Sequence, residues 1–241
     1  MHPGKLSIII PVYNEERTVV AVLEKVFEVE LPIGITKEVV IINDASKDNS
    51  RSEIENYILQ RGNRDDLIFI NHEVNLGKGG SVHTALRNIS GDYFIIQDAD
   101  LELDPNDFVK ILKPVLENRA DVVFGSRFLN TKPDGVNWSL SYFANSFLTS
   151  FSNFAFGTKL TDMETCYKLI PAFVMKDIFL EEERFGFEPE ITAKLSRQKK
   201  LRITEVAVSY QARKNWQGKK IGWKDGFRAI FCIVKYGILK K

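Results

Sequence analysis

The stretch YFIIQDAD, residues 93–100, is an apolar run that ends in two closely spaced aspartates. Four similar apolar runs occur between residues 6 and 126: LSIIIP at 6–11, EVVIIND at 38–44, LIFINH at 67–72 and DVVFGS at 121–126. Runs of this kind are typical of strands that are covered on both faces of a parallel sheet. Stretches with helical spacing separate them, at residues 18–28, 49–60, 80–88 and 108–118. The alternation predicts an α/β fold in which a mostly parallel sheet is flanked by helices.

The second half of the chain continues without a linker, an internal repeat or a low-complexity tract. Its predicted elements are helices at 138–156 and 188–198, strands at 165–170 and 202–210, and a final amphipathic helix at 223–239. With 241 residues, of which 44% are hydrophobic, the chain can bury one large core. We therefore expect a single domain over residues 1–241, with residues 211–241 as a basic loop and amphipathic helix that extend it.

Composition argues against several classes of protein. The apolar stretches are far shorter than the about 20 residues that a membrane-spanning helix needs, and the N-terminus lacks the pattern of a signal peptide. We therefore expect a cytoplasmic protein. Cys166 and Cys232 lie far apart in the sequence and have no partners at metal-ligand spacing, which indicates neither a disulfide framework nor a zinc site.

The charge of the chain is divided unevenly. Residues 197–241 contain 13 Lys and Arg but only 2 Asp and Glu, so that they carry +11, whereas residues 1–196 carry −10. The asymmetry indicates that the C-terminal segment faces something anionic, either phosphate groups or a membrane surface. A solvated basic face is the alternative. Nucleic acid is not among the expected partners.

Acidic side chains follow three of the predicted strands. PVYNEE at 11–16 follows the first strand, NDASKD at 43–48 ends the second, and DADLE at 98–102 ends the fourth. Because the carboxyl ends of parallel strands meet at one edge of a sheet, these carboxylates would repel one another unless a cation or a hydrogen-bonding ligand offset their charge. Magnesium or manganese prefers hard oxygen ligands and completes its shell with substrate phosphates. The alternative for an isolated Asp-x-Asp is an ordinary loop cap.

The segment NLGKGG, residues 75–80, follows the third strand and opens a helix. Glycines there permit close backbone approach, a helix N-terminus attracts anions, and Lys78 adds a positive charge, so the segment is a candidate phosphate contact. A tight turn before a helix is the alternative. The spacing matches neither a Walker loop nor Gly-x-Gly-x-x-Gly, which weakens an oxidoreductase interpretation.

Together, the motifs PVYNEE, INDASKD, NLGKGG, DADLELDP and GSRF resemble the GT-A, Rossmann-like glycosyltransferases of family 2. The likeness runs from Leu6 to about Trp223 and is greatest to dolichyl-phosphate mannose synthases and the related glucosyl enzymes that act on polyprenyl phosphates. It implies a metal-dependent, inverting hexosyltransferase that moves mannose or glucose from a GDP- or UDP-sugar to polyprenyl or dolichyl phosphate.

The resemblance also implies roles for the matching residues. Those that would bind the nucleotide-sugar are Pro11, Tyr13, Asn14, Glu15, Asp44, Gly77, Lys78 and Asp98. Those that would hold Mg²⁺ or Mn²⁺ are Asp98, Asp100 and Glu102. Those implied in catalysis are Asp100, Arg127 and Asp162. Glu102 stands where many relatives carry Gln, and Asn43 departs from the commoner pair of aspartates.

The acceptor decides whether a proton acceptor is needed. A hydroxyl acceptor must lose a proton, and Asp162 is the candidate base because the family often carries its base near this position. A phosphate monoester has a second pKa of about 6, so its oxygen is already largely ionised at neutral pH and needs cations more than a base. The candidate cations are Arg127, Arg213, Lys219 and Lys220. A basic loop without a bound ligand is the alternative for the last three.

The final predicted helix has an apolar stripe that includes Phe227, Phe231 and Val234 and is flanked by basic residues. Such a helix can lie in a membrane interface at the cytoplasmic face, or bind a membrane protein. Alternatively, the stripe packs on the core or on a second subunit. Two other functions are alternatives: a nucleotidyltransferase, whose usual Gly-rich N-terminal signature is replaced here by PVYNEE, and a catalytically inactive nucleotide-binding module.

Overall fold

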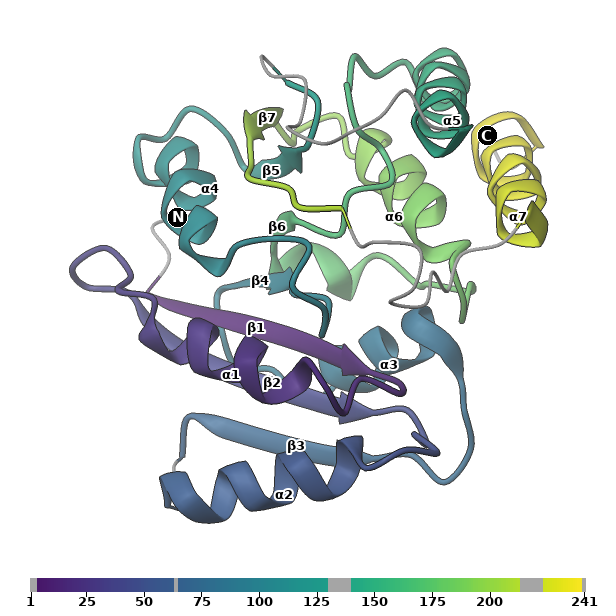
Figure 1. Cartoon of the computed structure of the whole chain (residues 1–241). Helices are drawn as coiled ribbons and strands as arrows, with labels where there is room; N and C mark the ends of the chain where they lie inside the picture. Colours follow the sequence, from purple (N-terminus) through teal and green to yellow (C-terminus); the bar gives the residue numbers. More distant parts are fainter. Residues whose placement is uncertain (1–3, 63–64, 130–139, 213–222, 240–241) are drawn as a thin grey trace.

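The computed structural model describes residues 4–62, 65–129, 140–212 and 223–239. These residues form a seven-stranded sheet with the strand order β3-β2-β1-β4-β6-β5-β7 and helices on both faces (Figure 1). The strands are β1 (Lys5–Val12), β2 (Thr36–Asn43), β3 (Leu67–Asn71), β4 (Tyr93–Ile96), β5 (Val122–Ser126), β6 (Lys168–Pro171) and β7 (Ile203–Ala207). β6 runs antiparallel to both of its neighbours, and the other pairs are parallel. The predicted mostly parallel α/β sheet is confirmed.

The helices follow the strands in the alternation that the sequence predicts. The α-helices are α1 (Val19–Glu28), α2 (Ser50–Arg61), α3 (Gly77–Leu86), α4 (Phe108–Leu116), α5 (Leu140–Phe156), α6 (Phe187–Ser196) and α7 (Trp223–Ile233). Short 3₁₀ turns, η1 (Pro105–Asp107) and η2 (Ala172–Lys176), precede α4 and follow β6, and a π-helical segment, η4 (Val234–Leu239), continues α7.

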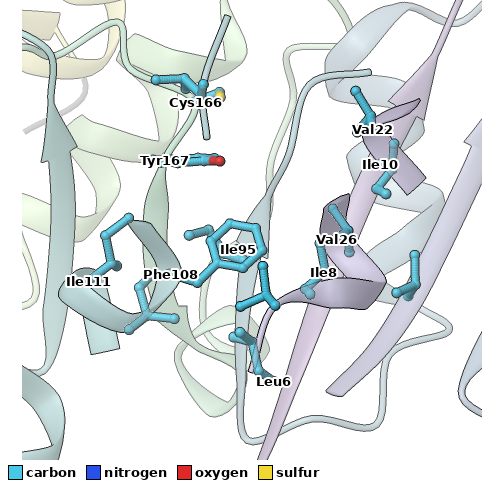
Figure 2. Close-up of a cluster of buried hydrophobic side chains, with 14 of the residues drawn as sticks. Leu6, Ile8, Ile10, Val22, Val26, Ile95, Phe108, Ile111, Cys166 and Tyr167 are labelled. Atoms are coloured by element: carbon cyan, nitrogen blue, oxygen red, sulfur yellow. The ribbon is translucent and has the colours of Figure 1, made fainter. Parts of the chain in front are cut away.

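The core forms on both faces of the sheet because successive side chains of a strand point to opposite sides. Leu6, Ile8 and Ile10 of β1 pack on one face with side chains of α1 and α4, as Figure 2 shows. Ile9 of β1 belongs to the cluster on the other face, which α3 and α6 cover. Full burial of one such aliphatic side chain contributes about 1.5–3 kcal/mol. Strands this apolar can be stable only when helices cover both of their faces.

The start of α3 and the start of β6 are among the predicted boundaries that differ from the structure. Helix α3 begins at Gly77 rather than at residue 80, because the Asp44 carboxylate, from the end of β2, accepts hydrogen bonds from the backbone N–H groups of Leu76 and Gly77. The strand predicted at 165–170 is shorter at its start, and β6 begins at Lys168. Both boundaries depend on contacts between segments that are distant in the sequence.

Helix α7 packs beside α5 (Figure 1), through Ala229 and Ile233 against Leu148 of α5 and Met163. The remainder of the predicted basic loop, residues 213–222, lies outside the described residues. Among the helices that the structure describes, none is both long enough and apolar enough to cross a lipid bilayer.

Candidate active site

The loops after β1 and β2 are tied together by backbone-to-side-chain hydrogen bonds. The Asn14 N–H donates to Ser46 Oγ at 3.0 Å, and the Lys47 N–H donates to Asn14 Oδ1 at 2.7 Å. The Glu15 N–H donates to Ser50 Oγ at 2.7 Å. Asn14 has φ of 53°, a left-handed conformation that Asn tolerates better than most residues. The two predicted nucleotide-binding segments therefore form one connected surface.

The loop after β4 joins the same surface. Thr18 Oγ1 lies 2.7 Å from Glu15 Oε2 and 2.9 Å from the carbonyl oxygen of Ala99, between the two aspartates. The structure thus brings the acidic ends of β1, β2 and β4 together at one edge of the sheet, as the parallel topology requires.

Asp44 is 3% exposed and is engaged by the protein itself. Its Oδ1 lies 2.8 Å from His72 Nδ1 and accepts the Leu76 N–H at 2.8 Å, while its Oδ2 accepts the Gly77 N–H at 2.7 Å. The predicted contact of Asp44 with a nucleoside is not tested by these bonds and stays a prediction. What they establish is that Asp44 fixes the start of α3, and with it the position of Lys78.

Two glycines of the 75–80 segment, Gly77 and Gly79, are required by packing against residues 182–184. A Cβ added at Gly79 would lie 2.1 Å from the Glu182 carbonyl oxygen, and one added at Gly77 would lie 2.7 Å from the Glu183 carbonyl oxygen. Gly77 also has φ of 85°, which side chains rarely adopt. The close backbone approach that the sequence indicated is therefore an approach to another protein segment, and a contact with phosphate remains a prediction.

Lys78 projects from the first turn of α3 toward two carboxylates. Its Nζ lies 2.9 Å from Asp98 Oδ1 and 3.1 Å from Glu188 Oε1. Burial disfavours ionisation of Asp98, but the neighbouring Lys78 ammonium outweighs burial and lowers the pKa of Asp98 below its ordinary value. The pKa of Lys78 is raised well above its ordinary value, because the same carboxylates outweigh its burial. This strand end carries an ionised carboxylate beside a permanent cation.

The donor set at this strand end fits a divalent cation that shares its ligands with a substrate. Asp98 and Asp100 offer hard oxygens, of which Asp98 is held ionised. Glu102 faces Tyr210. Burial and the charge of Glu102 raise the pKa of Tyr210 to about 12. In the part of the chain that the structure describes, no three His, Cys, Asp or Glu side chains are grouped so that they could hold a metal ion. A metal would therefore have to take further ligands from phosphate and water, as Mg²⁺ commonly does.

Arg127 and Asp162 form a two-pronged ion pair. Arg127 Nε donates to Asp162 Oδ2 at 2.7 Å and Nη2 donates to Oδ1 at 2.8 Å, while the Arg127 backbone N–H adds a third bond to Oδ2 at 3.1 Å. Asn145 Nδ2 of α5 donates to Asp162 Oδ1 at 3.2 Å. The Asp162 side chain is wholly buried, whereas that of Arg127 is 19% exposed. Both oxygens of Asp162 thus accept two hydrogen bonds each, and this geometry suits the orientation of Arg127.

Three ionisable residues that the sequence did not single out lie beside these groups. Lys168 is wholly buried in β6 and bonds to Glu188 of α6, which also binds Lys78. Glu164 has a pKa raised to about 7, because burial and then the charge of Glu188 disfavour its ionised form. A lysine within the apolar strand motif TCYKLI was the available signal, since a buried ammonium needs a carboxylate partner. The partner itself, 20 residues away, could not be found from spacing.

The predicted acceptor-binding residues Arg213, Lys219 and Lys220 lie outside the described residues. Pro11 is part of β1, and Tyr13 follows the strand, so both lie at the strand end that joins the surface described above. The residues after β7 also contact the acidic loop after β4, because the Gln211 N–H donates to the carbonyl oxygen of Glu102 at 2.8 Å. Gln211 therefore lies beside the acidic loop.

A mostly parallel sheet with acidic loops gathered at its carboxyl edge defines an α/β protein whose ligand site lies at that edge. Residues 7–179 match the family model described as glycosyl transferase family 2. The chain belongs to glycosyl transferase family 2.

Named relatives and solved structures add to this assignment. The chain is 27% identical over 217 residues to a dolichyl-phosphate beta-glucosyltransferase of Trichomonas vaginalis, which covers 85% of this chain and 65% of the relative. It is 24% identical over 236 residues to a dodecaprenyl-phosphate galacturonate synthase of Rhizobium johnstonii, covering 95% of this chain and 65% of the relative. The chain thus spans about two thirds of the length of these relatives.

Among solved structures, glucosyl-3-phosphoglycerate synthase from Mycobacterium tuberculosis, in complex with Mn²⁺, UDP and phosphoglyceric acid, superposes with a TM-score of 0.69. The match covers 98% of this chain and 79% of that one, at 15% sequence identity. At this identity the likeness establishes the fold, and it confirms the predicted GT-A architecture.

Proposed function

We propose that the chain is a metal-dependent, inverting glycosyltransferase that moves a hexose, mannose or glucose, from a GDP- or UDP-sugar to polyprenyl or dolichyl phosphate. The observation that carries this proposal is the Arg127–Asp162 pair. It supplies a preorganised guanidinium beside the acidic loops and leaves Asp162 engaged, which is the arrangement that an acceptor needing a cation rather than a base requires. The relatives named for dolichyl phosphate and dodecaprenyl phosphate support the same acceptor class.

In this reaction a phosphate oxygen of the acceptor attacks the anomeric carbon from the face opposite the diphosphate. The bond from that carbon to the diphosphate oxygen breaks, and the nucleoside diphosphate leaves with the electron pair. The acceptor arrives ionised, since the second pKa of a phosphate monoester is about 6. Arg127 orients the acceptor phosphate, and Lys78 offsets charge that develops on the leaving diphosphate. Magnesium or manganese at Asp98 and Asp100 would supply further stabilisation of that charge.

The remaining assignments follow from the connected loops at the sheet edge. The nucleoside and ribose are bordered by the segment after β1, with Pro11, Tyr13, Asn14 and Glu15. Asp44 hydrogen-bonds the nucleoside. Gly77 positions the first turn of α3 next to the diphosphate. Glu102 is a further candidate metal ligand beside Asp98 and Asp100.

The alternative is transfer to a sugar hydroxyl with Asp162 as the base. Both carboxylate oxygens of Asp162 accept hydrogen bonds from Arg127, which argues against this alternative, because a proton acceptor must have a lone pair directed at the substrate. A family member that binds a nucleotide without catalysis is the other alternative. Both make different predictions in an assay with matched acceptors.

The decisive experiment is calorimetry of UDP, GDP, UDP-glucose and GDP-mannose with and without Mn²⁺, followed by transfer assays on a polyprenyl phosphate and on the corresponding polyprenol. Metal-dependent binding of a nucleotide-sugar and transfer to the phosphate alone are the expected results. Transfer to the alcohol at a similar rate would favour the alternative with a base, and binding without transfer would favour the inactive module. If no nucleotide binds under any metal condition, the proposal fails.

The enzyme meets its lipid acceptor at the cytoplasmic face of a membrane, through the surface formed by α5 and α7. Helix α5 has no charged residue along its 17 residues. Both helices expose aromatic side chains: Phe143 by 54%, Phe147 by 59% and Phe154 by 83% on α5, and Phe227 by 66% and Phe231 by 51% on α7. Aromatic side chains next to basic residues are typical of surfaces that bind an anionic lipid interface. The +11 charge of residues 197–241 adds the complementary attraction.

Co-sedimentation with phosphatidylglycerol vesicles and with phosphatidylcholine vesicles tests this surface. The double variant Phe147→Ser/Phe231→Ser is expected to bind anionic vesicles about tenfold more weakly or worse. Ile33→Ser, which removes a fully exposed apolar side chain from the α1–β2 loop, serves as the matched control. Equal binding by the double variant and the control would remove the membrane assignment.

A further inference from the structure

Three carboxylates of the site each face a cationic side chain: Asp98 faces Lys78, Glu188 faces Lys168, and Asp162 faces Arg127. Glu164 lies among them and differs. Its Oε1 is buried and has neither a hydrogen bond nor an ion pair with a described residue, whereas Glu188 Oε1, which also lacks a hydrogen bond, lies 3.1 Å from Lys78 Nζ. Buried polar atoms are nearly always paired, and an exception within a site calls for a ligand group that pairs with it.

The neighbours of Glu164 define its place in the site. The charges that act on it most strongly are those of Glu188, Lys168, Arg127 and Asp162. Glu188 is bound to Lys78, on the side proposed to bind the donor diphosphate, and Arg127 is on the side proposed to bind the acceptor phosphate. Glu164 is therefore close to Glu188, the carboxylate that binds Lys78, and to Arg127, which places it among the groups proposed to bind the two phosphates.

The chemistry of this position selects the ligand. A phosphate oxygen would be repelled by Glu164 together with Glu188 and Asp162, because all three are acidic. Lys168 and Arg127 lie nearby, but each is already paired with another carboxylate, Glu188 and Asp162. An uncharged hydroxyl group can donate a hydrogen bond to the buried oxygen without adding charge.

We propose that Glu164 binds a hydroxyl group of the hexose and so contributes to the choice of donor sugar. This inference rests on the proposed glycosyltransferase function. The nearly neutral pKa of the carboxyl agrees with it, because a group with a pKa of about 7 can pair with a neutral hydroxyl at a small electrostatic cost. Glu164 is a specificity residue in this assignment and takes no part in proton transfer.

Calorimetry separates the sugar contribution from that of the nucleotide. For the wild type, Glu164→Ala and Glu164→Gln, the dissociation constants of UDP, UDP-glucose, GDP and GDP-mannose are measured with Mn²⁺. The Ala variant is expected to bind the preferred nucleotide-sugar about tenfold to a hundredfold more weakly, as expected for loss of a hydrogen bond to an ionisable group, with unchanged affinity for the nucleoside diphosphate. The Gln variant keeps an acceptor oxygen and should fall between the two.

Glu117→Ala, at the exposed end of α4, is the matched control and should bind all four ligands as the wild type does. Thermal melting checks that each variant folds, and the Gln variant preserves the test if the Ala variant does not fold. Donor analogues that lack one hydroxyl in turn give the positive identification. The analogue that lacks the hydroxyl bound by Glu164 should bind the wild type more weakly than the complete donor. The Ala variant should bind that analogue and the complete donor with equal affinity.

Two results overturn the assignment of Glu164. One is an equal loss of affinity for the nucleoside diphosphate and the nucleotide-sugar, which would place the residue at the phosphates or in the structural framework. The other is unchanged binding of the nucleotide-sugar by the Ala variant. A wild-type protein that binds none of the four ligands would instead refute the proposed function on which the assignment rests.

Discussion

Replacing Asp162 by Asn tests whether this residue positions Arg127 or accepts a proton. The substitution preserves shape but removes the negative charge that three N–H groups of Arg127 contact at 2.7, 2.8 and 3.1 Å. Removing one partner of a buried pair typically costs 3–5 kcal/mol, and the 19% exposure of the Arg127 side chain places this pair near about 3 kcal/mol. For a chain of this size the melting temperature should fall by about 6–12 °C.

The assay combines thermal melting with transfer to a polyprenyl phosphate. We expect Asp162→Asn to lower the melting temperature and reduce transfer, because the guanidinium is no longer held in place. Arg127→Gln should do the same. The double variant should lose less than the sum of the two single variants, since the second substitution has no pair left to break.

Asp121 and Arg202 form a matched control pair. Arg202 Nη2 and Nε contact the two oxygens of Asp121 at 2.9 and 3.0 Å, but both side chains are much more exposed. Asp121→Asn should therefore change the melting temperature far less. The positioning role would be refuted if Asp162→Asn left the melting temperature unchanged and abolished transfer to a hydroxyl acceptor only.

Three further predictions follow from other contacts. The pKa of Glu38 is lowered to about 2, because hydrogen bonds from Lys5 and from serine groups outweigh its burial. The stability that Glu38 contributes is therefore present above pH about 4.5 and is lost as the pH falls toward 2. Glu38→Gln should remove this part of the acid sensitivity in equilibrium unfolding. Gly79→Ala should destabilise the fold by about 1–3 kcal/mol and weaken nucleotide binding, because the new Cβ meets the Glu182 carbonyl oxygen; Gly226→Ala, with open space around it, should be near neutral in the same melts. Chelation of divalent metal, or Asp98→Asn, should weaken nucleotide-sugar binding in calorimetry, and unchanged affinity in both cases would contradict a metal-assisted diphosphate site.

The sequence predicts most of the fold because its signals are local. Apolar runs such as EVVIIN at residues 38–43, separated by helical periodicity, place each strand and helix within a few residues of its observed position. Helix α3 begins at Gly77, earlier than predicted, because the carboxylate of Asp44, from the end of another strand, accepts the Gly77 N–H. The direction of β6 and its place between β4 and β5 also depend on how the chain returns through α5, which no local pattern encodes.

The candidate site divides in the same way. Loops that follow parallel strands can be placed at one edge from topology alone, which is why the acidic segments after β1, β2 and β4 were predicted to meet. The pairing of Arg127 with Asp162, 35 residues apart, could not be foreseen, nor could the link from Lys78 through Glu188 to Lys168. Side-chain partners are chosen by three-dimensional proximity, and residue spacing does not report it.

By itself, the sequence determined the class of fold, the family and the position of the acidic pair Asp98 and Asp100 at a strand end, because hydrophobic periodicity and short motifs are local properties of the chain. Only the tertiary structure decided what those groups contact. It engaged Asp162 with Arg127, set Lys78 against Asp98, and left an oxygen of Glu164 buried without a partner among the described residues. Burial and proximity set the charge state and hydrogen-bonding capacity of a side chain, and both are established only when distant segments pack together.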